Sequence, residues 1–207
     1  MLGLCQNRGK QMLRDLSAPR AALFLAALAV VSALLSNFVS YVPHTNDFPK
    51  LDDVPLLPGL YFGVVIAIGV FLWKGKSAFE LAVVIAAVVI SWILAWRTAI
   101  AVSDFLGQFH TGDITAPDSR GFPFNLAISG IVAGLVGSLG TAIAISLVCP
   151  DFRDHADWLR TIALGTVTGA LLHFVDRPWE TVLPLLIVWQ PVVAASVGYG
   201  LVIARKR

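Results

Sequence analysis

Charged residues are scarce in this chain of 207 residues. They make up 14% of the sequence, against about 25% in a typical soluble domain, whose surface must face water. Hydrophobic residues account for 57%, and the mean hydropathy is +0.79. A chain with so little polar surface cannot cover a globule of its own size, so its solvent is expected to be largely lipid. The small net charge of +2 also excludes a surface that tracks nucleic-acid phosphates.

Cysteine is almost absent as well. Cys5 and Cys149 are the only two, which excludes a secreted scaffold held together by disulfides. Their spacing matches no metal-binding motif. The sequence also has no Walker loop, and no pair of carboxylates lies in the middle of an apolar stretch. We therefore expect neither a metal nor a cofactor.

What the sequence does have is six long apolar stretches, separated by charges and prolines. A helix needs about 20 apolar residues to cross a bilayer, and all six stretches reach or approach that length. Because backbone polar groups cannot stay unpaired in lipid, the stretches are expected to be helices. The sequence thus predicts an all-α, polytopic integral membrane protein, a single six-helix bundle over 21–204 with spans at 21–42, 56–73, 79–102, 124–149, 158–175 and 181–204.

The basic residues predict how this bundle is oriented. Eleven of the 15 fall before the first span, between spans two and three, between span four and the first turn of span five, or after the last span. Since cytoplasmic loops collect Lys and Arg, we expect the basic tail 1–20 and the basic end 205–207 to be cytoplasmic, in the inner or plasma membrane. The opposite loops are acidic. Their negative charge would attract cations to this face of the protein. The other interpretation is that the acidic excess has no function and results only from the placement of basic residues on the cytoplasmic side.

Polar side chains within the apolar stretches are the candidate solute-binding residues, because burying them in a membrane is costly. Arg97 follows Trp96 in the third span, and it either snorkels to the outer headgroups or faces the bundle and pairs with an acidic group. Gln190 lies in the sixth span between Trp189 and Pro191, where proline interrupts the helical hydrogen bonds. A broken helix beside a mid-membrane amide is typical of transporters. A glutamine bonded to a neighbouring helix is the other interpretation.

His173 is the only histidine inside a predicted span, so a b-type haem would lack its second ligand. We predict that His173 joins Arg97, Gln190, Trp96 and Trp189 in a tentative solute-binding set, and we predict no catalytic residue.

Small residues recur at four-residue spacing in the fourth and fifth spans. Such stripes let the backbones of neighbouring helices approach closely. We therefore expect these two spans to pack against each other, and the glycines predicted to form the contact are Gly130, Gly134, Gly137, Gly165 and Gly169.

Three functions are consistent with these patterns. The first is transport or binding of a small solute between the helices, and the chain is similar in size and topology to the substrate-binding subunits of energy-coupling-factor importers. The second is a non-catalytic subunit or scaffold, with a membrane protein or a second copy of the chain as its partner. The third is an intramembrane hydrolase, since residues 127–134 resemble the nucleophile region of rhomboid-type serine proteases. Such a protease uses a histidine of its sixth span as general base, and 181–204 contains none. We therefore do not expect an enzyme.

Overall fold

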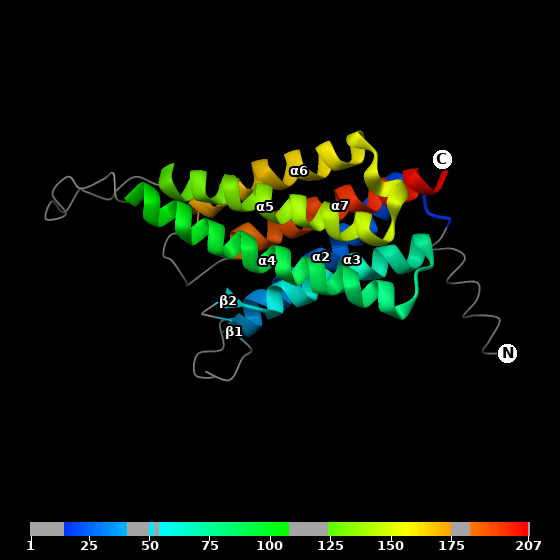
Figure 1. Cartoon of the computed structure of the whole chain (residues 1–207), viewed down its shortest axis with the longest axis horizontal. Coiled ribbons are helices and arrows are strands. Elements are labelled where there is room, and N and C mark those ends of the chain that lie inside the picture. Colours follow the sequence, from blue (N-terminus) through cyan, green and yellow to red (C-terminus); the bar gives the residue numbers. More distant parts are fainter. Residues whose placement is uncertain (1–14, 41–49, 52–53, 108–123, 175–182, 207) are drawn as a thin grey trace, which may run out of the picture.

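The computed structural model of the chain describes residues 15–40, 50–51, 54–107, 124–174 and 183–206. Within these ranges the chain is helical apart from two short paired strands and a few connecting residues (Figure 1). The α-helices are α2 (Ala18–Ser40), α3 (Leu57–Lys74), α4 (Ala78–Gly107), α5 (Phe124–Val148), α6 (His155–Gly169) and α7 (Leu183–Lys206). The 3-10 helices η1 (Pro150–Arg153) and η2 (Ala170–Phe174) precede and follow α6, and β1 (Lys50–Leu51) pairs antiparallel with β2 (Val54–Pro55).

Most of these helices match the length of a membrane crossing. Among the described residues, five helices are long and apolar enough to span a bilayer, namely α2, α3, α4, α5 and α7. The 15 residues of α6 continue into the 5 of η2, and together they extend over about 32 Å, close to the roughly 30 Å of the hydrocarbon core. The predicted all-α fold is confirmed, and five or six of its helices are long and apolar enough to span a membrane.

The helix boundaries differ from the predicted spans in two informative places. α4 does not end at 102 but continues to Gly107, so Ser103 and Asp104, which the sequence placed in a loop, are helical. Backbone hydrogen bonds do not require apolar side chains, and both of these side chains line the cavity described below. α6 begins before 158 because Asp154 caps it, its carboxylate accepting a hydrogen bond from the backbone N–H of Ala156 at 3.2 Å.

The two predicted basic ends also overlap the helices. α2 includes the last residues of the tail 1–20, and α7 reaches Lys206 within 205–207. Residues 1–14 and Arg207 lie outside the described part of the chain.

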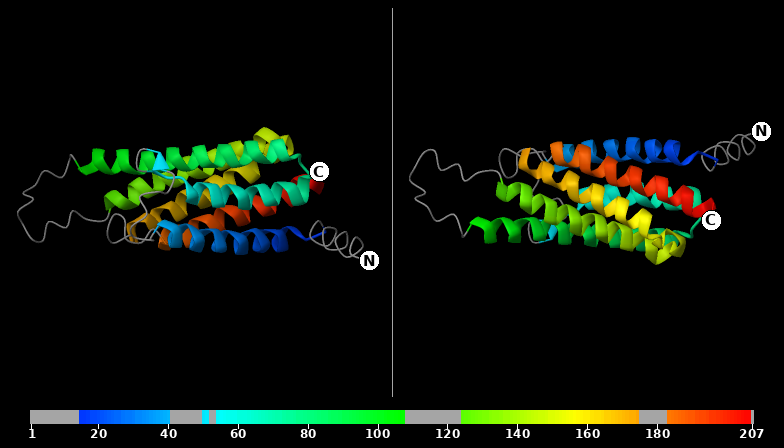
Figure 2. Two further views of the ribbon diagram at one scale, coloured as in Figure 1. Left: turned by 90° about the horizontal axis from the view of Figure 1, so that it is seen from below. Right: turned by 90° about the horizontal axis from the view of Figure 1, so that it is seen from above.

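The helices form a ring in chain order, in which each packs beside the next and α7 returns to α2 (Figure 2). α3 also contacts α7 across the middle of the ring. The start of α2 and the end of α7 lie side by side, since a Cβ added at Gly198 would approach the Ala21 carbonyl oxygen to 2.9 Å. We call this the terminal end of the bundle. The opposite end, where α4 finishes at Gly107 and α5 starts at Phe124, is the far end.

Glycines set the distance between α5 and α6. A Cβ at Gly130 would overlap the carbonyl oxygen of Gly169, and a Cβ at Gly134 would overlap that of Gly165. Only residues without side chains allow the two backbones to approach this closely.

Towards the terminal end the interior of the ring is filled by apolar side chains. Val70 of α3, Ile145 of α5 and Leu201 of α7 are completely buried, as is Phe152 of η1. They belong to one continuous core cluster. This half of the bundle is therefore closed.

The glycine contact gives the first prediction. Gly134→Val should lower the free energy of unfolding by about 1–3 kcal/mol, because the new side chain forces α5 away from α6. Leu135→Val, on the exposed face of the same helix, is the matched control and should change it by less than about 0.5 kcal/mol. Thermal unfolding of both variants in one detergent measures the difference. Equal midpoints would mean that the helices do not touch at Gly134.

Candidate functional site

In contrast to the terminal half, the far half of the bundle is hollow. A cavity of about 500 Å³ lies between α3, α4, α5, η2 and α7. Ser103 and Asp104 of α4 and Leu126 of α5 line it close to the far ends of their helices. Ser91 of α4 and Thr141 of α5 lie deeper along the same helices. The cavity therefore has its mouth at the far end and its floor near the middle of the bundle.

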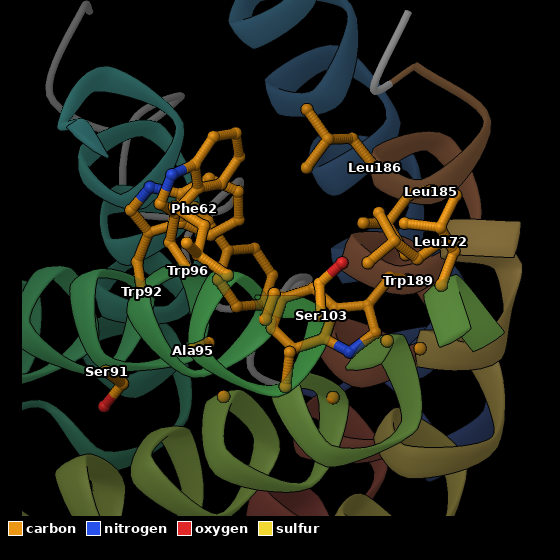
Figure 3. A pocket seen from close by; sticks show the side chains of 18 of the residues that line it. Phe62, Ser91, Trp92, Ala95, Trp96, Ser103, Leu172, Leu185, Leu186 and Trp189 are labelled. Atoms are coloured by element: carbon orange, nitrogen blue, oxygen red, sulfur yellow. The ribbon is translucent and has the colours of Figure 1, made fainter. Parts of the chain in front are cut away.

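Aromatic side chains dominate the wall of the cavity. Figure 3 shows the rings of Phe62, Trp92 and Trp96 gathered on one side, with Trp189 opposite them among leucines of η2 and α7. The indoles of Trp92 and Trp96, one helical turn apart, have ring centroids 5.7 Å from each other. Phe62 and Trp189 approach across the floor, with centroids 5.4 Å apart.

Trp189 is held in place at this floor. Its indole N–H donates to the carbonyl oxygen of Gly165 at 3.0 Å, and only 8% of the residue is exposed. A Cβ at Gly137 would come within 3.0 Å of the indole, so the glycine leaves the room that the ring occupies. The floor thus depends on both α5 and α6.

Trp92 is fixed in a similar way on the other side. Its indole N–H donates to the carbonyl oxygen of Pro55 at 2.7 Å, which ties strand β2 to α4. A Cβ at Gly59 would lie 2.8 Å from the Cβ of Trp92, so α3 needs a glycine here. With the N–H groups of Trp92 and Trp189 bonded to backbone, these two indoles offer the cavity mainly their ring surfaces.

Polar groups in the cavity are few. Asp104 is the only ionisable side chain among the described residues that line it, and it is exposed at the mouth. The hydroxyls of Ser91 and Thr141 each donate to the carbonyl four residues earlier in their own helix, both at 2.8 Å. The site is therefore an aromatic, largely apolar chamber with a single carboxylate at its entrance.

Only some of the solute-binding residues predicted from the sequence line the cavity. Trp96 and Trp189 both line the cavity. Arg97 does not, and its side chain is exposed. His173 belongs to η2 through its backbone, but its side chain lies outside the described part of the chain.

Gln190, the remaining predicted residue, is completely buried beside the cavity floor. Neither its amide oxygen nor its amide nitrogen has a hydrogen-bond partner among the described residues. Leaving a buried polar group without a partner costs about 1–3 kcal/mol. Such a group is commonly explained by a water or a ligand.

Four of the predicted packing glycines lie at the contact of α5 with α6, namely Gly130, Gly134, Gly165 and Gly169. Gly137 does not, because it faces Trp189 of α7 and Ala95 of α4 instead. Gly130, Gly134, Gly137 and Gly169 line the cavity, while Gly165 is pressed against Ser138. Glycine therefore has a double effect here, because it brings two helices together and leaves space on their inner side.

Sequence reasoning missed several lining residues, including Phe62, Trp92 and Asp104. One signal was present in α4, whose lining positions 92, 96, 99 and 103 follow the three- and four-residue spacing of one helix face. Phe62 carried no such signal, since apolar residues surround it on every side.

A second polar group of side chains joins α6 to α7 near the terminal end. Arg160 donates to Asp157 at 2.8 Å and to the hydroxyl of Ser196 at 3.3 Å, and its guanidinium lies 4.5 Å from the ring centre of Tyr199. The Thr161 and Ser196 hydroxyls are 2.7 Å apart. Asp157 is 2% exposed, and its second carboxylate oxygen has no partner within the described ranges. These contacts fasten the two helices below the cavity.

The described residues contain no group of three or more His, Cys, Asp and Glu that could hold a metal. Cys149, which follows α5, is buried, and burial raises the pKa of its thiol to about 11. The thiol is therefore protonated and poorly reactive at neutral pH.

Comparison of the chain with protein-family models, with curated proteins and with solved structures finds no match. The site thus has to be interpreted from its own geometry.

The α6–α7 contact gives the second prediction. Arg160→Met should lower the free energy of unfolding by about 3 kcal/mol, because it leaves the buried Asp157 carboxylate without its cation. The double variant Asp157→Asn with Arg160→Met should recover part of this loss. Thermal unfolding measures both effects.

Lys76→Met, which removes a half-exposed pair with Glu80 at the surface, is the control and should leave the midpoint almost unchanged. A loss in Arg160→Met no larger than in this control would mean that Arg160 does not support the fold.

Proposed function

We propose that this protein binds a small solute in the far-end cavity and carries it across the membrane. The cavity itself is the observation that supports this proposal most directly. Its volume of about 500 Å³ lies within the roughly 300–1,000 Å³ of small-molecule sites, which are likewise lined by aromatic and apolar groups with few polar ones. A purely structural bundle would be expected to fill this space with side chains, as the terminal half does.

The distribution of charge supports an orientation for the bundle. Arg20, Lys74, Lys76, Arg153 and Arg205 all belong to helix ends or connections at the terminal end. Because cytoplasmic segments collect basic residues, we propose that both termini are cytoplasmic and that the cavity faces the outside. The solute would then enter from the outer side of an inner or plasma membrane.

Polar groups below the floor support onward passage. Gln190 follows Trp189 in α7, and Pro191 comes next, so the helix lacks a backbone N–H at this level. Counting back along α7 and forward along α2 from the Gly198–Ala21 contact puts Gln190 and Ser32 within about one helical turn of the same level along the bundle axis. The hydroxyl of Ser32 is also buried without a partner among the described residues. A solute that passed the Trp189 indole would meet these unpartnered groups.

The proposal predicts that a bound solute is lost when the cavity is filled. Ala99 lines the cavity, whereas Ala86 of the same helix is exposed and does not line it. Native mass spectrometry of the protein extracted from its own membrane in a mild detergent should show a reproducible small-molecule mass in the wild type. That mass should be absent from Ala99→Trp and retained in Ala86→Trp.

Retention of the same mass in Ala99→Trp would contradict binding in this cavity. A stoichiometric partner protein in place of a small molecule would instead favour the other function, a non-catalytic subunit of a larger membrane complex.

A further inference from the structure

Among the residues that the structure describes, the cavity wall combines ring surfaces with one negative charge and has no positive charge. Phe62, Trp92, Trp96 and Trp189 supply the rings, and Asp104 is the sole ionisable group among the described lining residues. Arg97, the basic residue nearest in sequence to this wall, does not line it. No group in the described wall would therefore neutralise an anionic solute.

Aromatic rings attract cations because their faces carry partial negative charge. In this cavity the N–H edges of Trp92 and Trp189, which would attract an anion or an acceptor, are occupied by the carbonyl oxygens of Pro55 and Gly165. The faces are left for the solute. Apart from the hydroxyls of Ser91, Ser103 and Thr141, the remaining wall consists of aliphatic side chains and glycine backbone, which bind apolar groups without directional demands.

The position of the Asp104 carboxylate indicates where a solute would enter the cavity. Asp104 lies at the mouth, three residues before the end of α4, and it is exposed to solvent. A carboxylate at the entrance of a poorly hydrated chamber raises the local concentration of cations and disfavours anions. The acidic excess of the segments that the sequence predicts outside the membrane acts in the same sense.

From this arrangement we infer that the solute is a monovalent organic cation with apolar or aromatic substituents. This inference rests on the proposed function, since it names the chemical class that the same cavity accepts. Asp104 attracts and pairs with the positive centre, and the rings of Trp92, Trp96 and Trp189 receive the desolvated cation and its apolar groups.

Two ions of the same shape and opposite charge test the inference. Tetraphenylphosphonium and tetraphenylborate are titrated into the purified protein in an uncharged detergent, and the heat of mixing with empty micelles is subtracted. The wild type should bind the phosphonium more tightly than the borate. Asp104→Asn should weaken phosphonium binding about fivefold and reduce the preference between the two ions.

Asp151→Asn is the matched control, because it removes the same charge from an exposed residue after α5, near the terminal end. It should leave both affinities unchanged. A second pair of variants tests the rings: Trp96→Leu should weaken phosphonium binding, and Trp96→Phe should retain most of it.

The outcomes separate the inference from the proposed function. Equal or tighter binding of the borate, abolished by Ala99→Trp, would overturn the cation class and leave a solute-binding cavity. The cation class would also be overturned if the wild type did not bind the phosphonium, or if Ala99→Trp left phosphonium binding unchanged. The proposed function would then be decided by the co-purified mass alone.

Discussion

The close approach of α5 to α6 is the constraint on which the rest of the structure depends. The backbone carbonyl of Gly165 lies so near α5 that position 134 must be glycine, and the same oxygen accepts the indole N–H of Trp189. The contact thus fixes the ring that forms the cavity floor. On the inner side of the contact, the missing side chains of Gly130, Gly134 and Gly169 become the smooth wall of the chamber. One local property, the absence of a side chain, produces both the tight packing and the empty space.

The bundle is divided along its axis into a packed half and a hollow half. Apolar side chains close the terminal half, and the contacts of Arg160 with Asp157 and Ser196 join α6 to α7 there. The hollow half is lined by rings that are held through backbone carbonyls. A chamber open at one end and sealed at the other is what one conformation of a transporter requires. Buried polar groups such as Gln190 next to Pro191 lie where the seal would have to open.

Much of the fold could be predicted from the sequence, because the length of an apolar helix is dictated directly by the thickness of the membrane. The glycines between α5 and α6 could also be predicted, since their four-residue spacing can be recognised directly in the sequence. The cavity was only partly predictable. Trp96 and Trp189 were predicted because each is next in sequence to a polar residue within an apolar stretch. Phe62 has no such neighbour, and it lines the cavity only because α3 packs against α7. Arg97 is the opposite case, a residue predicted for the site that does not line it. A charge within an apolar stretch indicates that burying it would be costly, but it does not indicate which way the side chain points, and this side chain is exposed.

The most direct test of the account asks whether the cavity opens to the outside of the cell. Ser103, at the mouth, is replaced by cysteine in a Cys5→Ser background, in which buried Cys149 reacts slowly because the pKa of its thiol is about 11. A membrane-impermeant maleimide added to intact cells should label Ser103→Cys, whereas Ser77→Cys, exposed between α3 and α4 at the terminal end, should label only after permeabilisation. Labelling of position 103 only after permeabilisation would contradict the account, because the cavity would then face the cytoplasm or be closed.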